Sequence, residues 1–521
     1  MTNRKLKKIL KQNVIDAEKQ AQKHQFHINI PRRAMMRLAQ TAACLLLVAA
    51  MGVGYVAMVR MVGRQGNSDD TTLGINAGPG SQPGDTGENT GSDVVTTPDP
   101  QETTVSHGIS TTFDGQKLVV TELFKEGTSG NWWEFSNPDM SGDTMDMISL
   151  NRLMLTEQEL DCDIMQAASG SAEQYISWVK NSALINSSAA IVTGGADVMA
   201  TLAAQGLLEN WMSEQAAAYR MDFSAPYWPE EMARELTIGN KLYFVSGKIS
   251  ANTIASVYVV FAAPNINSML GIDIQSIVED GKWTFDKMYE LSAAGHALDK
   301  YGLALYDDSL VALAAAAGVE IADNAVKLHS SLYNGTALNF VNTLADNQSA
   351  GDIKLISRAS SEYIPNLFTV DTVANSYTME DVCLLLPLPT LSEDGKHLSP
   401  VGESAVYYSV AKGSDITLAY AVLHSLAKYS SQSTTYFLTD SKVPSYTELI
   451  SWRYAANDDS VRNLELAVDN MTFSPDAFLP SSTASVFLKN AINAADSTAR
   501  KEILTKSNLE QIIETHLGTI K

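Results

Sequence analysis

The side chains that could bind a ligand in this sequence are aromatic and acidic, and several of them follow predicted strands. Open α/β sheets bind ligands beyond the carboxyl ends of their strands, and aromatic rings flanked by Asn, Asp and Thr suit sugars. The apolar C–H face of a sugar stacks on the ring while its hydroxyls take hydrogen bonds. The alternative for each ring is a place in the core. We predict ligand contacts from Trp132, Trp133, Asp197, Trp228, Tyr258, Tyr407 and Trp452.

Catalytic and metal-binding motifs are missing from the sequence. It contains no GxSxG, GxxxxGK[ST], HExxH or EF-hand pattern, and its eight histidines lack helical ligand spacing. Cys162 and Cys383 show no CxxC spacing, so we expect buried thiols and no structural zinc. Acidic pairs at 230–231 and 458–459 fall where helices should start, as the helix dipole favours. We therefore predict no cofactor, no metal and no enzymatic activity.

Charge is distributed unevenly along the chain. The net charge is -22, yet residues 1–37 carry ten Lys and Arg and only two Asp and Glu, which leaves -30 for the rest. Phosphate backbones would repel so acidic a body, which argues against nucleic acid as a partner. At 521 residues the chain exceeds the roughly 250 to 300 residues of one core, so two lobes or one enlarged α/β domain are expected.

An apolar segment separates the basic leader (residues 1–36) from the acidic body. Between Arg37 and Arg60 stand 22 uncharged residues, enough to span about 30 Å of hydrocarbon. We predict a transmembrane helix at residues 37–62, with the leader in the cytoplasm and the body extracellular by the positive-inside rule. A cleaved signal peptide would have a shorter leader and a shorter apolar run, and "TAAC", which ends at Cys44, lies too early in the run for a lipobox.

Residues 63–108 are rich in Gly, Pro, Ser, Thr, Asp and Asn, so we predict a flexible tether there. From Ile109 onward strands alternate with helices, a pattern typical of βαβ units and a largely parallel sheet. Thr284 is expected to cap the helix that follows it. The expected strands are 116–123, 162–167, 189–195, 257–263, 382–389 and 405–413. The expected helices are 143–160, 172–184, 197–208, 284–299, 307–318, 330–347 and several after residue 415.

Several motifs occur in an order that is typical of one protein family. The central one is "IGNKLYFVSGKISANTIASVYVVFAAPNI" (238–266), followed by "GKWTFDKMYEL" (281–291). Together with the motifs around them, these stretches resemble extracellular solute-binding proteins of bacterial ABC importers, of the carbohydrate-binding family 1 type. The resemblance covers residues 110–515. The other motifs are "LAAQGLLENW" (202–211), "APYWPEEMARELTIGNKLYF" (225–244), "DKYGLALYDDSLVALAAAAG" (299–318), "VCLLLPLPTLSED" (382–394), "YYSVAKGSD" (407–415) and "DDSVRNLELAVDNMTF" (458–473).

This resemblance implies a two-lobed α/β fold of the periplasmic-binding-protein type (type II). Lobe one would hold residues 109–257 with a return segment at 405–521, and lobe two would hold residues 258–404, beginning with the first crossing strand. The implied function is capture of a sugar or oligosaccharide by lobe closure and its delivery to ABC permease subunits, on the surface of a Gram-positive-like cell. The apparent uncleaved helix departs from the usual leader of this family.

Two other functions remain open at this point. A ligand-free or sensory module of the same fold would contact a partner protein instead of a solute. A polysaccharide hydrolase would need two carboxylates facing each other across a cleft, about 5 to 9 Å apart, and no linear pattern excludes such a pair.

Overall fold

The structure is a computed structural model, and it describes most of the body of the chain. The chain divides into two units, Met1–Thr96 and Thr97–Lys521, and all described residues belong to the second. The predicted leader, membrane span (37–62) and tether lie outside them, and none of the described helices is long and apolar enough to cross a membrane. The described residues are 112–123, 132–137, 143–184, 190–213, 222–322, 332, 335–358, 365–378, 383–436, 441–480, 483–506 and 508–520.

Lobe one is built on a four-stranded sheet with the order β12-β3-β1-β2. The central strand β1 is parallel to β2 and β3, whereas β12 arrives from much later in the chain and pairs antiparallel with β3. Buried apolar side chains of β1 and β3 form the middle of the core. The strands are β1 (Gln116–Leu123), β2 (Cys162–Ser169), β3 (Ala190–Gly194) and β12 (Tyr407–Val410).

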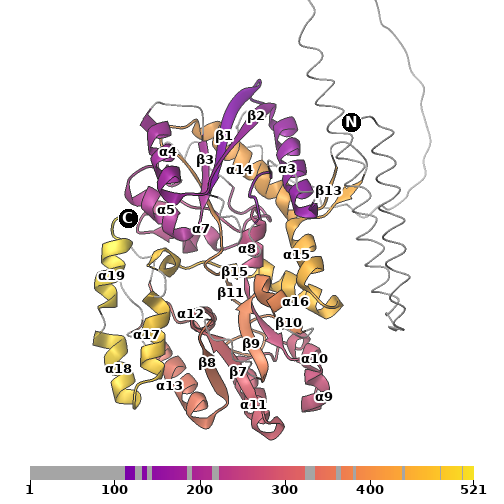
Figure 1. Cartoon of the computed structure of the whole chain (residues 1–521), viewed down its shortest axis with the longest axis vertical. Helices are drawn as coiled ribbons and strands as arrows, with labels where there is room; N and C mark the ends of the chain where they lie inside the picture. The colour runs from indigo at the N-terminus through magenta and orange to yellow at the C-terminus, as the bar shows by residue number, and fades with distance from the viewer. Residues whose placement is uncertain are drawn as a thin grey trace, which may run out of the picture. The chain divides into compact units, whose positions relative to one another are not determined.

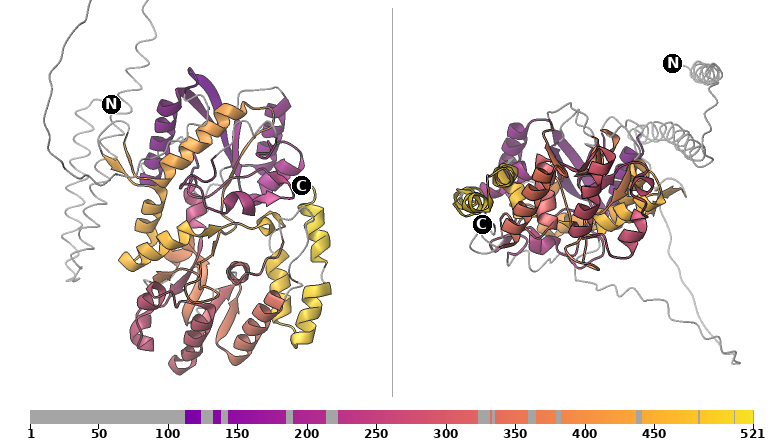
Figure 2. Two further views of the ribbon diagram at one scale, coloured as in Figure 1. Left: turned by 180° about the vertical axis from the view of Figure 1, so that it is seen from behind. Right: turned by 90° about the horizontal axis from the view of Figure 1, so that it is seen from below.

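Helices cover this sheet as the alternating pattern predicts. Helices α3 and α4 contact β2, α5 contacts β3, and α14 packs on α3. Figures 1 and 2 show the same grouping from opposite sides. The helices are α3 (Thr144–Leu160), α4 (Ala172–Leu184), α5 (Ala196–Ala204) and α14 (Ile416–Ser431).

Lobe two contains a five-stranded sheet with the order β10-β6-β9-β7-β8. Strand β7 is parallel to β8 and β9, while β6 is antiparallel to both β9 and β10. All five residues of β6 are buried, which agrees with the absence of charge from this stretch of the sequence. The strands are β6 (Tyr258–Ala262), β7 (Tyr301–Tyr306), β8 (Ile353–Ile356), β9 (Asn366–Thr372) and β10 (Leu384–Leu386).

Two helices of lobe two, α11 and α12, begin within one residue of the predicted starts at 284 and 307, whereas α13 begins five residues after 330 and α10 was not predicted. The hydroxyl of Thr284 accepts from the amide of Lys287 (3.2 Å), which confirms Thr284 as the cap of α11. Trp283 is fully buried, and its indole nitrogen donates to the carbonyl of Pro387 (2.8 Å). The helices here are α10 (Ile274–Glu279), α11 (Phe285–Ala293), α12 (Asp307–Ala316) and α13 (Gly335–Ala350). The two-lobed α/β arrangement is thus confirmed by the chain's own two sheets.

The chain passes between the lobes at a joint made of three adjacent segments. Val257, at the first crossing, bridges Val401 of the second in antiparallel fashion. Beside this bridge, the amide of Gly402 donates to the carbonyl of Ser256 (2.8 Å). The third segment is β15 (Met471–Thr472). It pairs in parallel with β11 (Ser399–Pro400) of the second crossing, and Figure 1 shows both strands between the lobes.

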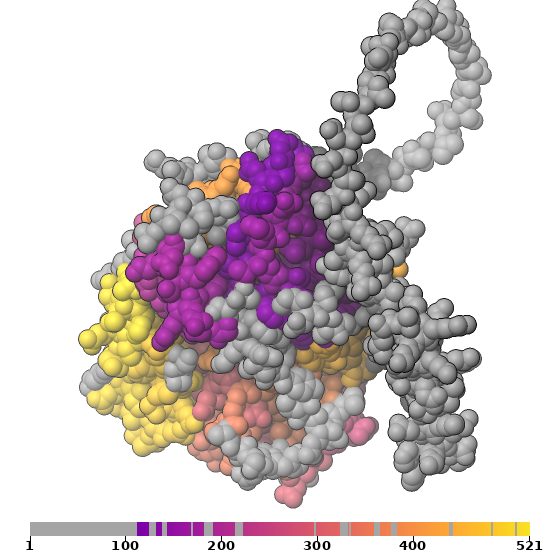
Figure 3. All heavy atoms as spheres, turned by 45° about the horizontal axis from the view of Figure 1, so that its top comes forward, coloured from indigo at the N-terminus to yellow at the C-terminus, as the bar shows by residue number. Residues whose placement is uncertain are grey.

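The return segment does not belong to lobe one alone, as the sequence analysis had assigned it. Helix α16 packs on β10, α17 packs on α12 and α13, and α18 packs on α13, all in lobe two. Figure 3 accordingly shows the carboxyl-terminal residues in yellow beside residues of both lobes. The helices concerned are α15 (Tyr446–Tyr454), α16 (Asp458–Asp469), α17 (Thr483–Ile492) and α18 (Ser497–Lys506).

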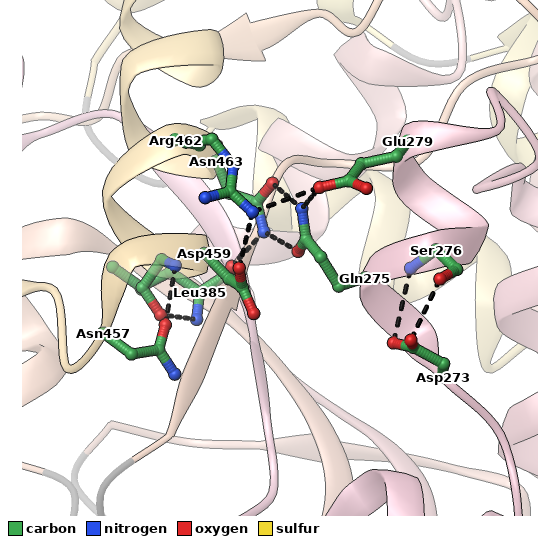
Figure 4. A network of polar contacts seen from close by, with 10 residues as sticks. Asp273, Gln275, Ser276, Glu279, Leu385, Asn457, Asp459, Arg462 and Asn463 are labelled. Carbon is green, nitrogen blue, oxygen red and sulfur yellow. Dashed lines mark hydrogen bonds and ion pairs between the residues drawn. The ribbon is translucent and has the colours of Figure 1, made fainter.

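A buried amide pair explains why α16 lies against lobe two (Figure 4). The side-chain nitrogen of Asn463 donates to the side-chain oxygen of Gln275 on α10 (2.8 Å) and to the carbonyl of Leu385 on β10 (2.8 Å). Asn463 is 2% exposed, so leaving these groups unpaired would cost desolvation free energy. At the surface, Arg462 reaches Glu279 (3.1 Å).

A buried carboxylate ties the first crossing to lobe one. The crossing follows the short helix α8 (Ala251–Ala255), whose cap is Ser250. The side chain of Glu134 accepts from the hydroxyl of Ser250 (2.8 Å), from the amide group of Asn252 (2.6 Å) and from the hydroxyl of Tyr408 on β12. Glu134 is 4% exposed, so the carboxylate depends on these donors instead of on water.

Arg152 on α3 balances the charge of this cluster and holds the same segment from the other side. Its guanidinium donates to the carbonyl of Ile249 (2.6 Å), to the hydroxyl of Ser430 (2.6 Å) and to the carbonyl of Glu134. The guanidinium also lies over the ring of Tyr446, 4.8 Å from its centroid. Helices α3, α14 and α15 therefore meet at the residues that precede the crossing.

We predict that Gly402→Ala loosens the joint. A Cβ atom at this position would lie 3.0 Å from Cγ2 of Thr372 and 3.2 Å from the carbonyl of Ser256. Overpacking of this kind costs about 1 to 3 kcal/mol of unfolding free energy, which urea denaturation would measure. Gly335→Ala is the matched control, because nothing lies within 4 Å of its Cβ position and α13 begins there. Equal stability of the two variants would contradict a tightly packed joint.

We also predict a pH dependence from Glu122, which neighbours the same cluster. Burial raises the pKa of Glu122 from 4.5 to about 8, and the nearby Glu134 carboxylate adds to the rise. A carboxyl that binds its proton more tightly when folded makes unfolding easier as pH rises between about 4.5 and about 8. Glu122→Gln should therefore lose less stability than the parent between pH 5 and pH 8. Exposed Glu173→Gln should keep the parent profile, and a Glu122→Gln profile parallel to the parent would refute the assignment.

Candidate functional site

A cleft of about 1550 Å³ lies between the two lobes. On the side of lobe one, its lining includes Leu123, Gly170 and Gly195, which end or directly follow β1, β2 and β3. On the side of lobe two, it includes Asp307 and Ser357, which directly follow β7 and β8. The carboxyl ends of parallel strands in both sheets thus face one cavity, which is where open α/β sheets bind ligands.

The joint forms a further wall of this cleft. Residues 400–407 of the second crossing and residues 469–477 around β15 all line it. The second of these segments continues into a short helical turn, Pro475–Phe478, whose Phe478 ring stacks on Phe244 of lobe one (4.7 Å between centroids). Any movement of one lobe relative to the other therefore changes the cleft where its walls meet.

The wall on the side of lobe two is an ion-pair network centred on Arg358. Its guanidinium pairs with Asp308 (2.5 Å) and with Asp371 (2.7 Å) and lies over the ring of Tyr306 (4.4 Å to the centroid). Asp371 has a side chain only 3% exposed, so Arg358 neutralises a buried charge. The hydroxyl of Tyr258 donates to Oδ2 of Asp308 (2.8 Å), the same oxygen that Nη2 of Arg358 contacts. Side chains from β6, β9, α12 and the end of β8 are fixed together here.

Asp197 and Glu403 line the cleft, and neither forms an ion pair with another described residue. Asp197 lies in the first turn of α5 in lobe one, and Glu403 lies on the second crossing. The pKa of Glu403 is raised, first by burial in the cleft and then by the negative charges of Asp308 and Asp197. Arg358 opposes part of this rise. Glu403 is thus close enough to acidic groups of both lobes to feel their charge.

The described lining of the cleft is strongly acidic. It contains ten Asp and Glu but three Arg and Lys, namely Arg234, Arg358 and Lys396. Each of the three cations is already paired with an acid: Arg234 with Glu231 (2.6 Å), Arg358 as described, and Lys396 with Glu230 (3.0 Å). The pair between Lys396 and Glu230 links a loop that follows β10 to lobe one, but both side chains are exposed, so it stabilises by only about 0.2 to 1 kcal/mol.

Three of the seven residues predicted to contact ligand line this cleft. Asp197 projects from lobe one, and Tyr258 lies at the base of lobe two. Tyr407 borders the cleft but is 1% exposed and packs against Phe478 (5.1 Å between centroids). Burial and the neighbouring Asp308 raise the pKa of Tyr258, which stays a hydrogen-bond donor. Tyr258 lines the cleft and is at the same time buried, with 4% of its surface exposed.

The four predicted tryptophans do not belong to the described lining. Trp228 is 4% exposed and packs on Phe223 (6.1 Å between centroids), which makes it a core residue of lobe one. Trp452 is 62% exposed on α15, outside the cleft. The backbone of Trp132 is held by Asn252 (2.9 and 2.8 Å), and its neighbour Trp133 is likewise absent from the lining. The described walls therefore offer no exposed aromatic face for stacking.

Asp308, Arg358 and Glu403 are cleft residues that the sequence analysis did not single out. Asp308 follows β7 by two residues, and Arg358 follows β8 by two residues. The rule that drew attention to aromatic residues after strands applies equally to charged ones, so the signal was present. Glu403 lies two residues before the expected return segment (405–521), outside every predicted strand and helix.

No family model and no curated protein sequence matches this chain. Similar solved structures are sugar-binding and solute-binding proteins at low identity. Because each of their TM-scores is below 0.5, the likeness does not carry the ligands of these proteins over to this chain. They include the cyclic alpha-maltosyl-1,6-maltose binding protein from Arthrobacter globiformis (13% identity, 78% of this chain and 98% of that one, TM-score 0.49), the sugar-binding protein MalE from Xanthomonas citri (11%, 78% and 97%, 0.49) and a family 1 extracellular solute-binding protein from Alicyclobacillus acidocaldarius (13%, 78% and 98%, 0.47).

We predict that Arg358→Met lowers the stability of lobe two by about 2 kcal/mol. The expected loss lies between the values for an exposed and a buried ion pair, because the side chain of Arg358 is 40% exposed and that of Asp371 is 3% exposed. Urea denaturation of the full chain would measure it. Arg462→Met is the control: its partners Glu279 and Asp459 are exposed and screened by water, so this variant should lose less stability than Arg358→Met. A similar loss in both variants would contradict the central role of Arg358.

Proposed function

We propose that this chain is a binding protein that captures a sugar or oligosaccharide between its two lobes and performs no covalent chemistry on it. The observation that carries the proposal is the cleft, whose walls are the carboxyl ends of parallel strands from two separate sheets. Its volume of about 1550 Å³ exceeds the roughly 300 to 1,000 Å³ of ordinary small-molecule pockets, so an oligosaccharide fits better than a monosaccharide. Carboxylates on both walls can accept hydrogen bonds from sugar hydroxyls.

Closure follows from the way the lobes are joined. The three segments of the joint are held by few backbone hydrogen bonds, such as that from the amide of Val401 to the carbonyl of Thr472 (3.2 Å). Hinges of this kind absorb large dihedral changes in a few residues. A ligand that touches both lobes binds the closed state more tightly, and this difference in affinity shifts the population.

The test is calorimetry of the full chain against malto-, cello-, xylo- and chito-oligosaccharides, with small-angle scattering to detect compaction. We expect heat and compaction with at least one of these sugars. Ala315→Trp should block the response, because Ala315 lines the cleft from α12. Ala204→Trp, an exposed helical alanine of α5 outside the described lining, should leave it unchanged. No heat with any sugar, or equal binding by the Ala315→Trp variant, would refute the proposal.

The proposal includes the location of the protein at the cell membrane and the delivery of its ligand. The segment 37–62 would anchor the protein, with the basic leader in the cytoplasm and the body outside the cell. Residues 63–108 would tether the body, which would deliver its ligand to ABC permease subunits. These steps rest on the amino-acid sequence.

A polysaccharide hydrolase is the second candidate, because Glu403 has a raised pKa and lies near two other carboxylates. A raised pKa is typical of the general acid of a glycosidase. However, Asp197 and Asp308 belong to different lobes, and Glu403 lies on the joint between them. A glycosidase needs a fixed carboxylate separation, which lobes free to move would not hold. Release of reducing ends from the same oligosaccharides would favour the hydrolase.

A further inference from the structure

We propose that the segment from Phe473 to Thr483 acts as a strap that limits how far the two lobes open. The segment leaves the joint after β15, attaches to lobe one, and enters lobe two at the first residue of α17. Such a restraint would act in the protein without ligand, so it goes beyond the proposed function and does not depend on which solute binds.

The first half of the strap is attached to lobe one. The amide of Phe473 donates to the side chain of Glu235 (2.8 Å), which is 13% exposed, so this bond is largely shielded from water. Phe478 is 4% exposed, and the centroid of its ring lies 4.7 Å from that of Phe244 and 5.1 Å from that of Tyr407. The helical turn that ends at Phe478 also contacts α5. One buried ring and one shielded hydrogen bond therefore hold this half of the strap in place.

The far end of the strap is attached to lobe two. Helix α17 begins at Thr483, five residues after Phe478, and packs on α12 and α13. Leu488 and Ala491 of α17 are fully buried. Lys489 pairs with Asp307 at the start of α12 (2.8 Å). Because α12 and α13 both belong to lobe two, α17 has to move with that lobe.

The connection between the two attachments is short. The amide and the hydroxyl of Thr483 both donate to the carbonyl of Pro480 (3.1 and 2.7 Å), which draws the chain in at this point. Even fully extended, five residues reach only about 17 Å, at roughly 3.3 to 3.6 Å per residue. Opening of the lobes beyond that reach would have to break one of the attachments.

The strap lies to one side of the joint and borders the cleft. Figure 1 shows α17 at one flank of the molecule, α15 and α16 at the other, and α8, β11 and β15 between them, and Figure 2 shows the same order from behind. Residues 473–477, Leu479, Pro480 and Thr483 all line the cleft. Points away from a hinge axis travel further during rotation than points on it. A short tether at the flank therefore restrains opening more than the central pairings do.

The test measures the distance between the lobes in the full chain without ligand. Spin labels are attached at Glu173→Cys on α4 and Ser349→Cys on α13, two exposed positions, after the three native cysteines have been replaced by alanine. Pulsed electron paramagnetic resonance then gives the distribution of distances. The strap variant carries four extra residues, Gly-Ser-Gly-Ser, directly after Pro480. We expect its distribution to broaden and to shift to longer distances, because a longer connection lets the attachments separate further.

A matched control carries the same insertion directly after Ala495, an exposed residue between α17 and α18. Both of these helices pack on α13 in lobe two, so this variant should keep the parent distribution. Phe478→Leu is a second strap variant, for the case that the insertion after Pro480 prevents folding. It weakens the attachment to lobe one and should also shift the distribution to longer distances. Phe285→Leu, which alters a similarly buried ring inside lobe two, should not.

The outcomes distinguish this inference from sugar capture. A parent-like distribution in the variant with the insertion after Pro480 overturns the strap, and Phe478→Leu decides in the same way if that variant does not fold. An equal shift in the matched control also overturns it, because the effect would then not arise from the connection between the lobes. Each of these results leaves the proposed function standing. A chain that shows the expected shift but binds none of the oligosaccharides loses the proposed function and keeps the strap.

Discussion

The buried carboxylate of Glu134 is the contact on which the arrangement of the two lobes depends. It accepts hydrogen bonds from the cap and the first turn of α8 and from β12, and both of these elements lead into or out of a crossing. Glu134 is 4% exposed, so its carboxyl group interacts with these donors and with the nearby positive charge of Arg152 in place of water. Burial raises the pKa of Glu134, while the donors oppose the rise. The polar cluster thus fixes the direction in which the first crossing leaves lobe one, something that apolar packing alone would leave variable.

Beyond this cluster, the joint consists of short pairings between the lobes. Each lobe has its own sheet and its own buried apolar core. The segments between them contribute only short pairings, β11 with β15 and the bridge of Val257 with Val401. Most of the stabilising contacts therefore lie within the lobes and few lie in the joint, and this distribution is typical of a hinge. The helices α16 to α18 reinforce this division, because they pack on lobe two after the chain has already built lobe one.

The sequence predicts the elements well and the site only in part, for reasons that differ from residue to residue. Strand ends could be located, and the rule for parallel sheets then brought Asp197, just after β3, to the cleft. Tyr258 reaches the cleft because β6 runs antiparallel to β9, so that its first residue lies opposite Thr372 at the carboxyl end of β9. Trp228 and Tyr407 sit in equally aromatic stretches, but a linear pattern does not tell which face of an element is covered, and both are buried. Arg358 belongs to the cleft wall because it pairs with Asp308, which lies 50 positions away in the sequence. The attachment of α16 arises from Asn463 and Gln275, 188 positions apart. Such pairings exist only once the chain has folded.

The charge of the cleft walls contributes to the free energy of lobe closure. In a hinged protein the affinity of the closed state has to exceed the cost of bringing the two walls together. In this cleft that cost includes repulsion between acids that belong to different lobes, since Asp197 and Asp308 both act on Glu403. Arg358 lowers the cost on the side of lobe two, but two carboxylates, Asp308 and Asp371, already share its charge. A ligand that contacts both walls therefore has to offset this repulsion before it can shift the population toward the closed state.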